Sequence, residues 1–261
     1  MQLADRVALV TGAGSGIGKA AAVLLGKEGA RVAALSRTRE ELEETVAEIE
    51  RNGGEGMVIT ADVSRPEDME RAVREIVDRW GRLDIVFANA GVNGVWAPIE
   101  DLDPEEWSRT LDINLTGTFL TIRYAVPHLK KRGGSVIVCA SINGTRVFSN
   151  SGASAYASSK AGQVALTKML ALELARDRVR VNVICPGAID TEIDENTERR
   201  GVEDLGVPTE FPEGPHPLEG KPGTSQQVAR LVLFLASDAS DHITGTEVWI
   251  DGGESLLGLR G

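Results

Sequence analysis

The stretch Thr11-Gly12-Ala13-Gly14-Ser15-Gly16-Ile17-Gly18 follows an apolar run at residues 7–10 and opens an apolar segment with helical spacing. Glycines at a strand-to-helix turn let the backbone approach a pyrophosphate, whose charge is met by free N–H groups and the positive end of the helix dipole. The spacing differs from G-x-G-x-x-G, because the glycines placed for this task are Gly12, Gly16 and Gly18. A dinucleotide site is the favoured interpretation, and a turn that only packs strand against helix is the alternative.

Short β-rich runs alternate with longer segments of helical periodicity along the whole chain. The runs lie at residues 7–10, 31–35, 56–60, 85–88, 135–140, 180–184 and 247–250, and the helical segments at 18–28, 39–52, 66–80, 104–131, 155–175 and 225–236. Nearly continuous apolar strands that alternate with helices indicate parallel pairing with both faces covered. We therefore expect an α/β fold, a Rossmann-like doubly wound parallel sheet of about seven strands flanked by helices on both faces.

The chain of 261 residues suits one domain, because α/β domains of this size often stay undivided. We expect a single dinucleotide-binding catalytic domain over residues 1–261. Residues 192–223 interrupt the alternation, since they contain no clear strand and collect prolines, glycines and acids. Loops of that length inside compact domains are usually functional, which predicts a long excursion after the sixth strand.

Composition and charge exclude several classes of function. The formal net charge of -11 opposes a nucleic-acid or anionic-membrane surface, which needs basic residues to meet phosphates. No basic leader with a long apolar segment and no membrane-length apolar run is present, so we expect a cytoplasmic protein. Cys139 and Cys185 lie in apolar runs typical of inert core thiols, and His128, His216 and His242 lack ligand spacing, so no metal site is predicted.

The end of the second predicted strand, where a dinucleotide fold meets the adenosine ribose, contains Ser36 and Arg37. An acidic residue there favours the unphosphorylated cofactor, and this strand end carries none. Because Ser36 and Arg37 suit a 2′-phosphate, NADP(H) is favoured and NAD(H) stays possible. A solvated charge at a helix start is the alternative for Arg37, and the nearby Glu40 and Glu41 oppose a bound phosphate.

Tyr156 and Lys160 lie four residues apart at the start of a predicted helix, where this spacing places two side chains on one face. A phenol with a pKa near 10 is a poor base at neutral pH. A close ammonium favours the phenolate and makes proton exchange with a substrate feasible. The pair predicts acid/base chemistry, with chance spacing on an exposed helix face as the alternative.

Further motifs follow in a fixed order along nearly the entire chain. They are Asp62-Val63, Asn89-Ala90-Gly91, Asn114, Ser141, Pro186-Gly187 with Thr191, and Asp251-Gly252-Gly253. Together with the glycine stretch and the Tyr156–Lys160 pair, this order resembles the classical short-chain dehydrogenase/reductase family.

The resemblance implies a catalytic set of four residues. Tyr156 would exchange a proton with the substrate oxygen, and Ser141 would hydrogen-bond that oxygen. Lys160 would tune Tyr156 and hold the nicotinamide ribose, while Asn114 would anchor a water that links Lys160 to solvent. Ser151 and Ser154 are rivals for the role of Ser141, because residues 146–152 lengthen the segment between serine and tyrosine.

The resemblance also implies a set of cofactor contacts. The glycine loop would hold the pyrophosphate, Asp62 and Val63 would contact the adenine, and Asn89 with Gly91 would lie beside the adenosine ribose and the central sheet. The predicted cofactor-binding residues are Gly12, Ser15, Gly16, Ile17, Gly18, Ser36, Arg37, Asp62, Val63, Asn89, Gly91, Tyr156, Lys160, Pro186, Gly187, Ile189 and Thr191, the last four flanking the nicotinamide. Residues 192–223 match the variable substrate lid of the family, and the pocket-lining guesses are Trp96, Arg146, Phe148 and Phe211.

The sequence thus predicts an oxidoreductase that transfers a hydride between NADP(H) or NAD(H) and the carbinol or carbonyl carbon of a small alcohol, sugar, polyol or ketone. One alternative is a 3-oxoacyl-carrier-protein reductase, for which Lys130, Lys131 and Arg132 would supply a docking patch. Another is a dinucleotide-binding sensor or scaffold without catalysis. The resemblance also implies a homotetramer built on the helices at 104–131 and 155–175.

Overall fold

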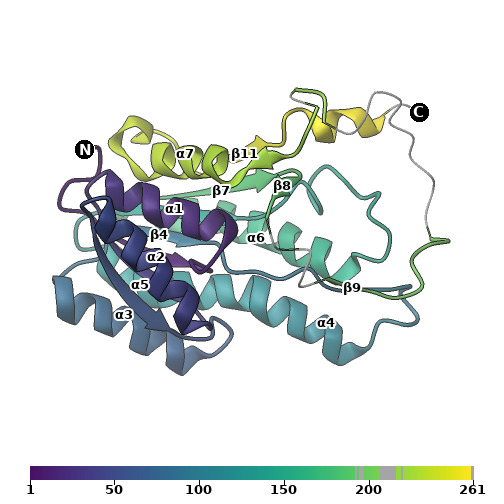
Figure 1. Ribbon diagram of the computed structural model, residues 1–261, viewed down its shortest axis with the longest axis horizontal. Helices are drawn as coiled ribbons and strands as arrows, with labels where there is room; N and C mark the ends of the chain where they lie inside the picture. Colours follow the sequence, from purple (N-terminus) through teal and green to yellow (C-terminus); the bar gives the residue numbers. More distant parts are fainter. Residues whose placement is uncertain (192, 194–196, 206–215, 219, 260–261) are drawn as a thin grey trace.

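The computed structural model describes residues 1–191, 193, 197–205, 216–218 and 220–259. A seven-stranded sheet forms its centre, in the order β11-β7-β6-β4-β1-β2-β3, and every neighbouring pair is parallel. The strands are β1 (Val7–Thr11), β2 (Arg31–Ser36), β3 (Glu55–Thr60), β4 (Ile85–Ala88), β6 (Gly134–Cys139), β7 (Val179–Pro186) and β11 (Glu247–Ile250). The order reverses between β1 and β4, so the predicted doubly wound sheet is confirmed (Figure 1).

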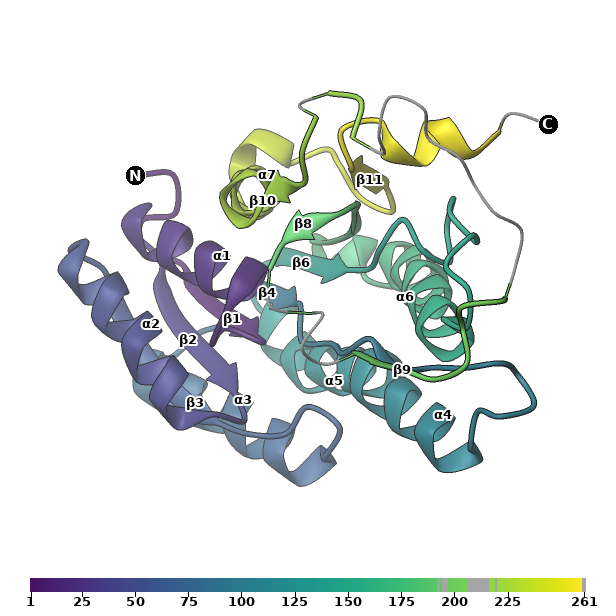
Figure 2. The same ribbon diagram turned by 45° about the vertical axis from the view of Figure 1, so that its right-hand side comes forward.

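Helices cover both faces of the sheet (Figure 2). The helices are α1 (Gly16–Lys27), α2 (Arg39–Arg51), α3 (Pro66–Trp80), α4 (Pro104–Leu111), α5 (Gly117–Leu129), α6 (Ser154–Glu173) and α7 (Ser225–Ala236). Residues of α1, α2 and α7 share one buried apolar cluster with one face of the sheet, and residues of α3, α5 and α6 share another with the opposite face. The sheet is therefore apolar on both sides, which explains the nearly continuous apolar strands.

The two cysteines lie on opposite faces of the sheet. Cys139 at the end of β6 belongs to the cluster under α1 and α7, and Cys185 in β7 belongs to the cluster under α5 and α6. Both thiols are free and buried. Burial raises the pKa of each thiol, which keeps both in the protonated, unreactive form.

The segment expected as one helix over residues 104–131 is divided. It begins with a capping box between Asp103 and Glu106, runs as α4, passes through a π-helical turn, η1 (Asp112–Thr116), and continues as α5. A π-helical turn adds a residue to the helical repeat and occurs mostly at functional sites. The apolar periodicity of this segment did not indicate the turn.

Two small sheets join loops at the carboxyl end of the main sheet. β5 (Gly94–Trp96) pairs with β9 (Thr197–Arg199), and β8 (Ile189–Asp190) pairs with β10 (Gly223–Thr224). The expectation of no strand within 192–223 is wrong at β9, because three polar residues that pair with a distant loop show no alternation in sequence. Of the expected lid, residues 192, 194–196, 206–215 and 219 lie outside the described residues.

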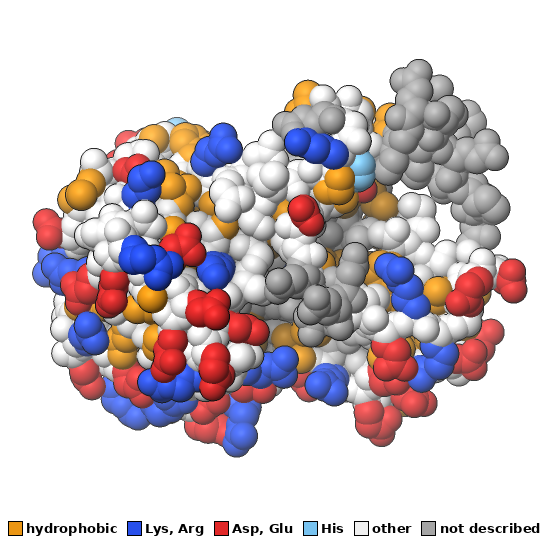
Figure 3. Space-filling model, in the orientation of Figure 1, with side chains coloured by type: hydrophobic (Ala, Val, Ile, Leu, Met, Phe, Trp, Pro, Cys, Tyr) orange, Lys and Arg blue, Asp and Glu red, His pale blue; other side chains and the backbone are white. Residues whose placement is uncertain are grey.

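Charged side chains of both signs are interspersed over the face of the molecule seen in Figure 3. Many form exposed ion pairs within or between neighbouring helices, such as Arg39 with Glu43. Within the described part of the chain, no helix combines the length and apolar character needed to span a bilayer.

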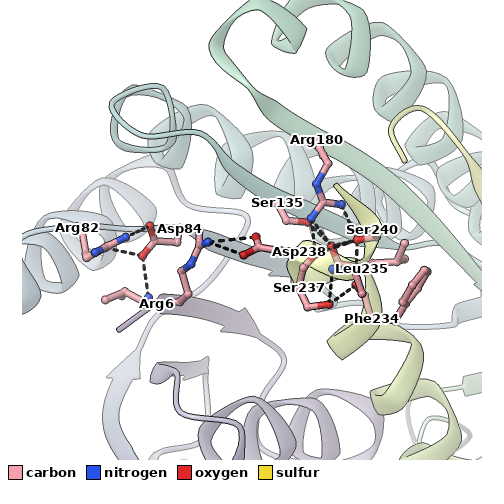
Figure 4. Close-up of polar contacts among 12 residues, drawn as sticks. Arg6, Arg82, Asp84, Ser135, Arg180, Phe234, Leu235, Ser237, Asp238 and Ser240 are labelled. Atoms are coloured by element: carbon pink, nitrogen blue, oxygen red, sulfur yellow. Dashed lines mark hydrogen bonds and ion pairs between the residues drawn. The ribbon is translucent and has the colours of Figure 1, made fainter. Parts of the chain in front are cut away.

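A polar network joins the amino ends of the strands to α7, far from the carboxyl ends where the loops gather (Figure 4). The buried carboxylate of Asp84 accepts hydrogen bonds from the backbone of Val7 and, through both oxygens, from Arg82. Arg180 donates to the Ser240 hydroxyl and to two carbonyls at the end of α7. The bonds of Arg180 hold the end of α7 against β7.

Candidate active site

A cleft of about 780 Å³ opens at the carboxyl ends of the central strands, where the order of the sheet reverses. In open α/β sheets this is the position where ligands bind, because loops on the two sides of the reversal diverge. Every predicted site residue except Gly18 and Asn114 lines this cleft. Gly18 and Asn114 support it from behind.

The glycine loop forms one wall. Gly12 has a φ of +65°, and a Cβ on it would lie 2.9 Å from the Ala90 backbone. Gly18 packs so closely on the Gly12 carbonyl that it leaves no room for a side chain. The N-cap residue of α1, Ser15, makes no side-chain capping bond, so the N–H groups of the first turn stay available. This cradle fits a pyrophosphate, whose charge the helix N-terminus stabilises.

Asn89 holds the loop in place. Its Nδ2 donates to the carbonyls of Thr11 and Gly12, and its backbone N–H donates to the Thr11 hydroxyl. The family resemblance implied that Asn89 lies beside the adenosine ribose and the central sheet. The structure shows that its side chain contacts the glycine loop while the residue also lines the cleft.

The adenosine end of the cleft carries Arg37, Glu41 and Asp62. The guanidinium of Arg37 has no hydrogen-bond or ion-pair partner among the described residues. The Ser36 hydroxyl is engaged with the backbone of Thr38, so it is less available to a ligand than expected. One Asp62 oxygen accepts two bonds from Ser64 in a tight turn after β3.

Tyr156 and Ser141 meet at the opposite end of the cleft. Tyr156 lies in the first turn of α6, Ser141 lies two residues after β6, and each is 7% exposed. Burial raises the pKa of Tyr156 to about 12, and a hydrogen bond between its phenol and the Ser141 hydroxyl opposes that rise. The phenol is therefore protonated at neutral pH and can act as a proton donor.

Lys160 shares this end of the cleft and is 4% exposed. Its Nζ lies 5.5 Å from the centre of the Tyr156 ring and donates to the Cys139 carbonyl at 2.8 Å. Burial lowers the pKa of the Lys160 ammonium. From the sequence, Lys160 was expected to lower the pKa of Tyr156. In the structure this pKa is raised instead, because Lys160 Nζ bonds to the β6 backbone and burial of the phenol outweighs any attraction.

Asn114 lies in the π-helical turn and is fully buried. Its carboxamide accepts from the Val92 N–H and donates to the Val92 carbonyl and the Ser159 hydroxyl. Its backbone carbonyl accepts from Gln163 and Thr118, which engages both lone pairs. The expected role of Asn114 as a water anchor stays a prediction: in the described structure Asn114 Oδ1 accepts one bond, which leaves a second lone pair for a water.

Of the three candidate serines, only Ser141 lines the cleft among the described residues. The Ser151 hydroxyl instead donates to the Leu205 carbonyl. Ser154 begins α6 and lies away from the cleft lining. The geometry thus places Ser141 beside the phenol.

Of the four residues predicted to line the substrate pocket, one lies in the lining of the cleft as described. Trp96 lines the cleft, whereas the Arg146 guanidinium stacks 3.6 Å from the centre of the Trp249 ring and Phe148 is 76% exposed. Phe211 lies outside the described residues. Sequence reasoning missed three lining asparagines, Asn93, Asn143 and Asn150, because isolated asparagines in loops are usually turn residues.

Sequence comparison finds relatives along the whole chain. A family model described as enoyl-(acyl carrier protein) reductase matches residues 12–255. The 3-oxoacyl-[acyl-carrier-protein] reductase FabG of Thermotoga maritima is 36% identical over 254 residues, which cover 97% of this chain and 99% of that protein. Cyclohexanol dehydrogenase of an Acinetobacter species is 37% identical over 249 residues, which cover 95% of this chain and 94% of that protein.

Solved structures agree with the sequence relatives. A 3-ketoacyl-ACP reductase from Sinorhizobium meliloti superposes with a TM-score of 0.93 at 53% identity, covering 96% of this chain and 99% of that one. Carveol dehydrogenase from Mycobacterium avium, in complex with NAD, superposes with a TM-score of 0.87 at 30% identity, covering 98% of this chain and 99% of that one. The chain belongs to the classical short-chain dehydrogenase/reductase family of oxidoreductase enzymes.

Proposed function

We propose that this enzyme interconverts a secondary alcohol and the corresponding ketone, with NADP(H) as the favoured nicotinamide cofactor. The observation that carries the proposal is that one cleft joins the glycine cradle to the buried group of Ser141, Tyr156 and Lys160. The bound nicotinamide supplies or accepts the hydride. The protein supplies orientation and the path of the proton.

Tyr156 is the proposed acid/base. In ketone reduction its phenol donates a proton to the substrate oxygen, and in alcohol oxidation the phenolate accepts that proton. Ser141 shares its hydroxyl between the phenol and the substrate oxygen, and its Oγ is held by the Asn143 N–H at 3.1 Å. In this proposal the reacting oxygen lies between the two buried hydroxyls of Ser141 and Tyr156.

Lys160 is proposed to tune the ionisation of Tyr156, and Asn114 is proposed to position the backbone at this end of the cleft. The ammonium of Lys160 is the one positive charge beside Tyr156 in the described cleft, and charge there favours the phenolate when Nζ turns from the Cys139 carbonyl toward the ligand. Asn114 holds the Val92 backbone on the other side. Gly91 fits between Asn114 and Lys160, since a Cβ on it would lie 3.2 Å from Asn114 Oδ1 and 3.5 Å from Lys160 Nζ.

The preference for NADP(H) rests on Arg37, whose guanidinium lines the adenosine end without a partner in the described structure. A planar guanidinium binds a phosphate through paired hydrogen bonds. Glu41 also lines this end and lies against Gly14, so its carboxylate opposes a bound phosphate in part. NAD(H) remains the second cofactor to be assayed.

A 3-oxoacyl-carrier-protein reductase is the second candidate, because relatives of that name include the solved structure at 53% identity. The positive charge of the docking patch expected for this activity is reduced, because the Lys130 ammonium pairs with Asp177 at 3.0 Å. Reduction of a 3-oxoacyl carrier protein at a higher kcat/KM than that of small ketones would favour this second activity.

We also propose a homotetramer in the cytoplasm. Apolar side chains are exposed on the helices expected to form subunit contacts, with Met169 70%, Leu172 82% and Phe119 42% exposed. Burying such side chains between subunits is favourable. Two free cysteines suit a reducing compartment. Sedimentation at micromolar concentration tests the assembly, and a monomer there would reject it.

The substitution Tyr156→Phe tests the proposed function. It removes the proton donor and leaves the ring in place, so turnover should fall by about 100-fold or more while nucleotide binding persists. The assay follows absorbance of the reduced nicotinamide over a panel of alcohols and ketones, with each cofactor in turn. Unchanged turnover would show that Tyr156 is not the acid/base.

A further inference from the structure

The substrate end of the cleft is lined by carboxamides. Asn93 precedes β5, Asn143 follows Ser141 by two residues, and Asn150 lies in the loop before α6. Together with Trp96 they line the same cleft as Tyr156, and we call these four residues the asparagine wall (Asn93, Trp96, Asn143 and Asn150). Three carboxamides from two distant loops here form one polar surface.

Each carboxamide of the asparagine wall is partly held and partly free. Asn150 Nδ2 donates to Asn143 Oδ1 at 2.8 Å, and Asn93 Nδ2 donates to the Thr197 hydroxyl at 2.7 Å. In the described part of the structure, Asn143 Nδ2, Asn150 Oδ1 and Asn93 Oδ1 have no partner. Asn93 is only 6% exposed. The wall thus presents one free donor and two free acceptors in fixed positions.

Neighbouring elements hold the wall in position. The Ala97 N–H donates to the Gly152 carbonyl, which ties the loop before α6 to β5, and Ser151 donates to the Leu205 carbonyl. The Arg200 N–H donates to the Trp96 carbonyl, and its side chain pairs with Glu106 of α4 at 2.7 Å. The polar atoms of the wall are therefore preorganised rather than on a free loop.

The wall carries no charge. The side chains that line the cleft from residues 92–96 and 140–150 are all uncharged, and Arg146 within that second segment stacks on Trp249 instead. The Arg199 guanidinium lies 5.1 Å from the centre of the Trp96 ring but does not line the cleft, so an anionic substrate group would meet carboxamides and no cation among the lining side chains of these two segments. An apolar ring would leave the free carboxamide atoms without partners, which costs binding free energy.

We propose that the asparagine wall selects a neutral substrate with a second oxygen function beside the reacting one, such as a polyol, a sugar or a hydroxyketone. This inference rests on the proposed alcohol–ketone activity and names its substrate class. A hydroxyl is both donor and acceptor, so it satisfies Asn143 Nδ2 together with Asn150 Oδ1 or Asn93 Oδ1.

Cyclohexanol and the cyclohexane-1,2-, 1,3- and 1,4-diols test the inference, because they share a ring and differ by one hydroxyl. Oxidation of each is followed with NADP⁺ and NAD⁺ as kcat/KM. The best diol should exceed cyclohexanol in kcat/KM by roughly tenfold, as expected for one additional net hydrogen bond to the wall. Equal or better oxidation of cyclohexanol would overturn the inference while leaving the proposed function intact.

The variant Asn143→Ala locates the effect. It removes the carboxamide and keeps the backbone N–H that holds Ser141, so the ratio of kcat/KM for the best diol over cyclohexanol should fall by roughly three- to tenfold. Asn52→Ala, at the exposed end of α2, is the matched control and should leave the ratio unchanged. A ratio that is unaltered in Asn143→Ala would refute the assignment to this wall.

The outcomes separate the two proposals. If the wild-type protein turns over neither these compounds nor any other alcohol or ketone of the panel with either cofactor, the proposed function is overturned and the inference with it. If it oxidises them without preference for a diol, only the inference is overturned. A binding titration with NADPH confirms in each case that the protein is folded.

Discussion

The side-chain nitrogen of Gln163 lies 2.8 Å from the backbone carbonyl oxygen of Asn114, inside the protein and within the π-helical turn. The same nitrogen donates to the Thr118 hydroxyl at 2.7 Å, and that hydroxyl donates to the same carbonyl. Gln163 is fully buried and follows Lys160 by three residues on α6. It therefore connects the helix that carries Tyr156 and Lys160 to the turn that carries Asn114.

Replacing Gln163 with Leu should destabilise the protein by about 1 kcal/mol, because the Asn114 carbonyl and the Thr118 hydroxyl lose the Gln163 donor while the carbonyl keeps its bond from Thr118. Urea unfolding measures the change. Gln226→Leu, on the exposed face of α7, is the matched control and should leave the midpoint unchanged. Equal midpoints for Gln163→Leu and the wild-type protein would show that the Gln163 contact does not stabilise the turn.

The rate of alcohol oxidation should rise with pH between about 7 and 9. Oxidation needs the phenolate of Tyr156 as a base, and burial raises the pKa of that phenol to about 12. Each increase in pH therefore increases the fraction of enzyme in which Tyr156 is a phenolate. Burial lowers the pKa of Lys160, so loss of its charge should end the rise at high pH. A flat profile of kcat/KM would contradict this role of Tyr156.

The same raised pKa of Tyr156 predicts a loss of stability at alkaline pH. The unfolded chain releases the phenolic proton near the ordinary pKa of 10, whereas the folded chain holds it to about 12. The contribution of Tyr156 to stability is therefore complete below about pH 10 and is lost as pH rises toward 12. Urea unfolding of the wild-type protein and of Tyr156→Phe across this range should show a smaller decline in the variant.

Replacing Arg37 with Ala should weaken NADPH binding by about tenfold and leave NADH binding nearly unchanged, because only NADPH carries the phosphate that the guanidinium would meet. Isothermal titration with both nucleotides measures the effect. Arg39→Ala is the matched control, since Arg39 pairs with Glu43 at 2.7 Å on α2. Equal weakening of both nucleotides would assign Arg37 a structural role instead.

Replacing Asp84 with Ala should lower the free energy of unfolding by about 3 kcal/mol without changing KM. The carboxylate is 1% exposed, and its removal leaves the Arg82 guanidinium and the Val7 N–H without their partner. Glu43→Ala is the control, because loss of the exposed ion pair between Glu43 and Arg39 should change the free energy of unfolding little. A raised KM in Asp84→Ala would show that the amino end of the sheet influences the cleft.

Much of the fold followed from local patterns. The seven strands and the bounds of α3 and α7 match expectation because apolar periodicity and proline or glycine signals act over a few residues. The π-helical turn and β9 were not foreseen. A π-helical turn changes the helical repeat by one residue, and β9 is stabilised by a partner strand about 100 residues earlier in the chain.

For the site, the motifs placed most lining residues in one cleft, because glycine turns and strand ends of a parallel sheet all meet at its carboxyl edge. The residues of the asparagine wall belong to no sequence motif that would have predicted their place in the cleft. Asn93 and Asn143 are distant in sequence and become neighbours of one cleft only through the loops that fold over it. The bonds of Lys160 to the Cys139 carbonyl and of Gln163 to the Asn114 carbonyl likewise depend on packing between elements.

The amino-acid sequence alone therefore determined the doubly wound sheet, the family resemblance and the glycine cradle, since each depends on residues close together along the chain. The tertiary structure alone decided which polar atoms face the substrate, how far burial raises the pKa of Tyr156, and which side chain engages the Asn114 carbonyl. Those properties arise from burial and from contacts between segments far apart in sequence, which no local pattern encodes.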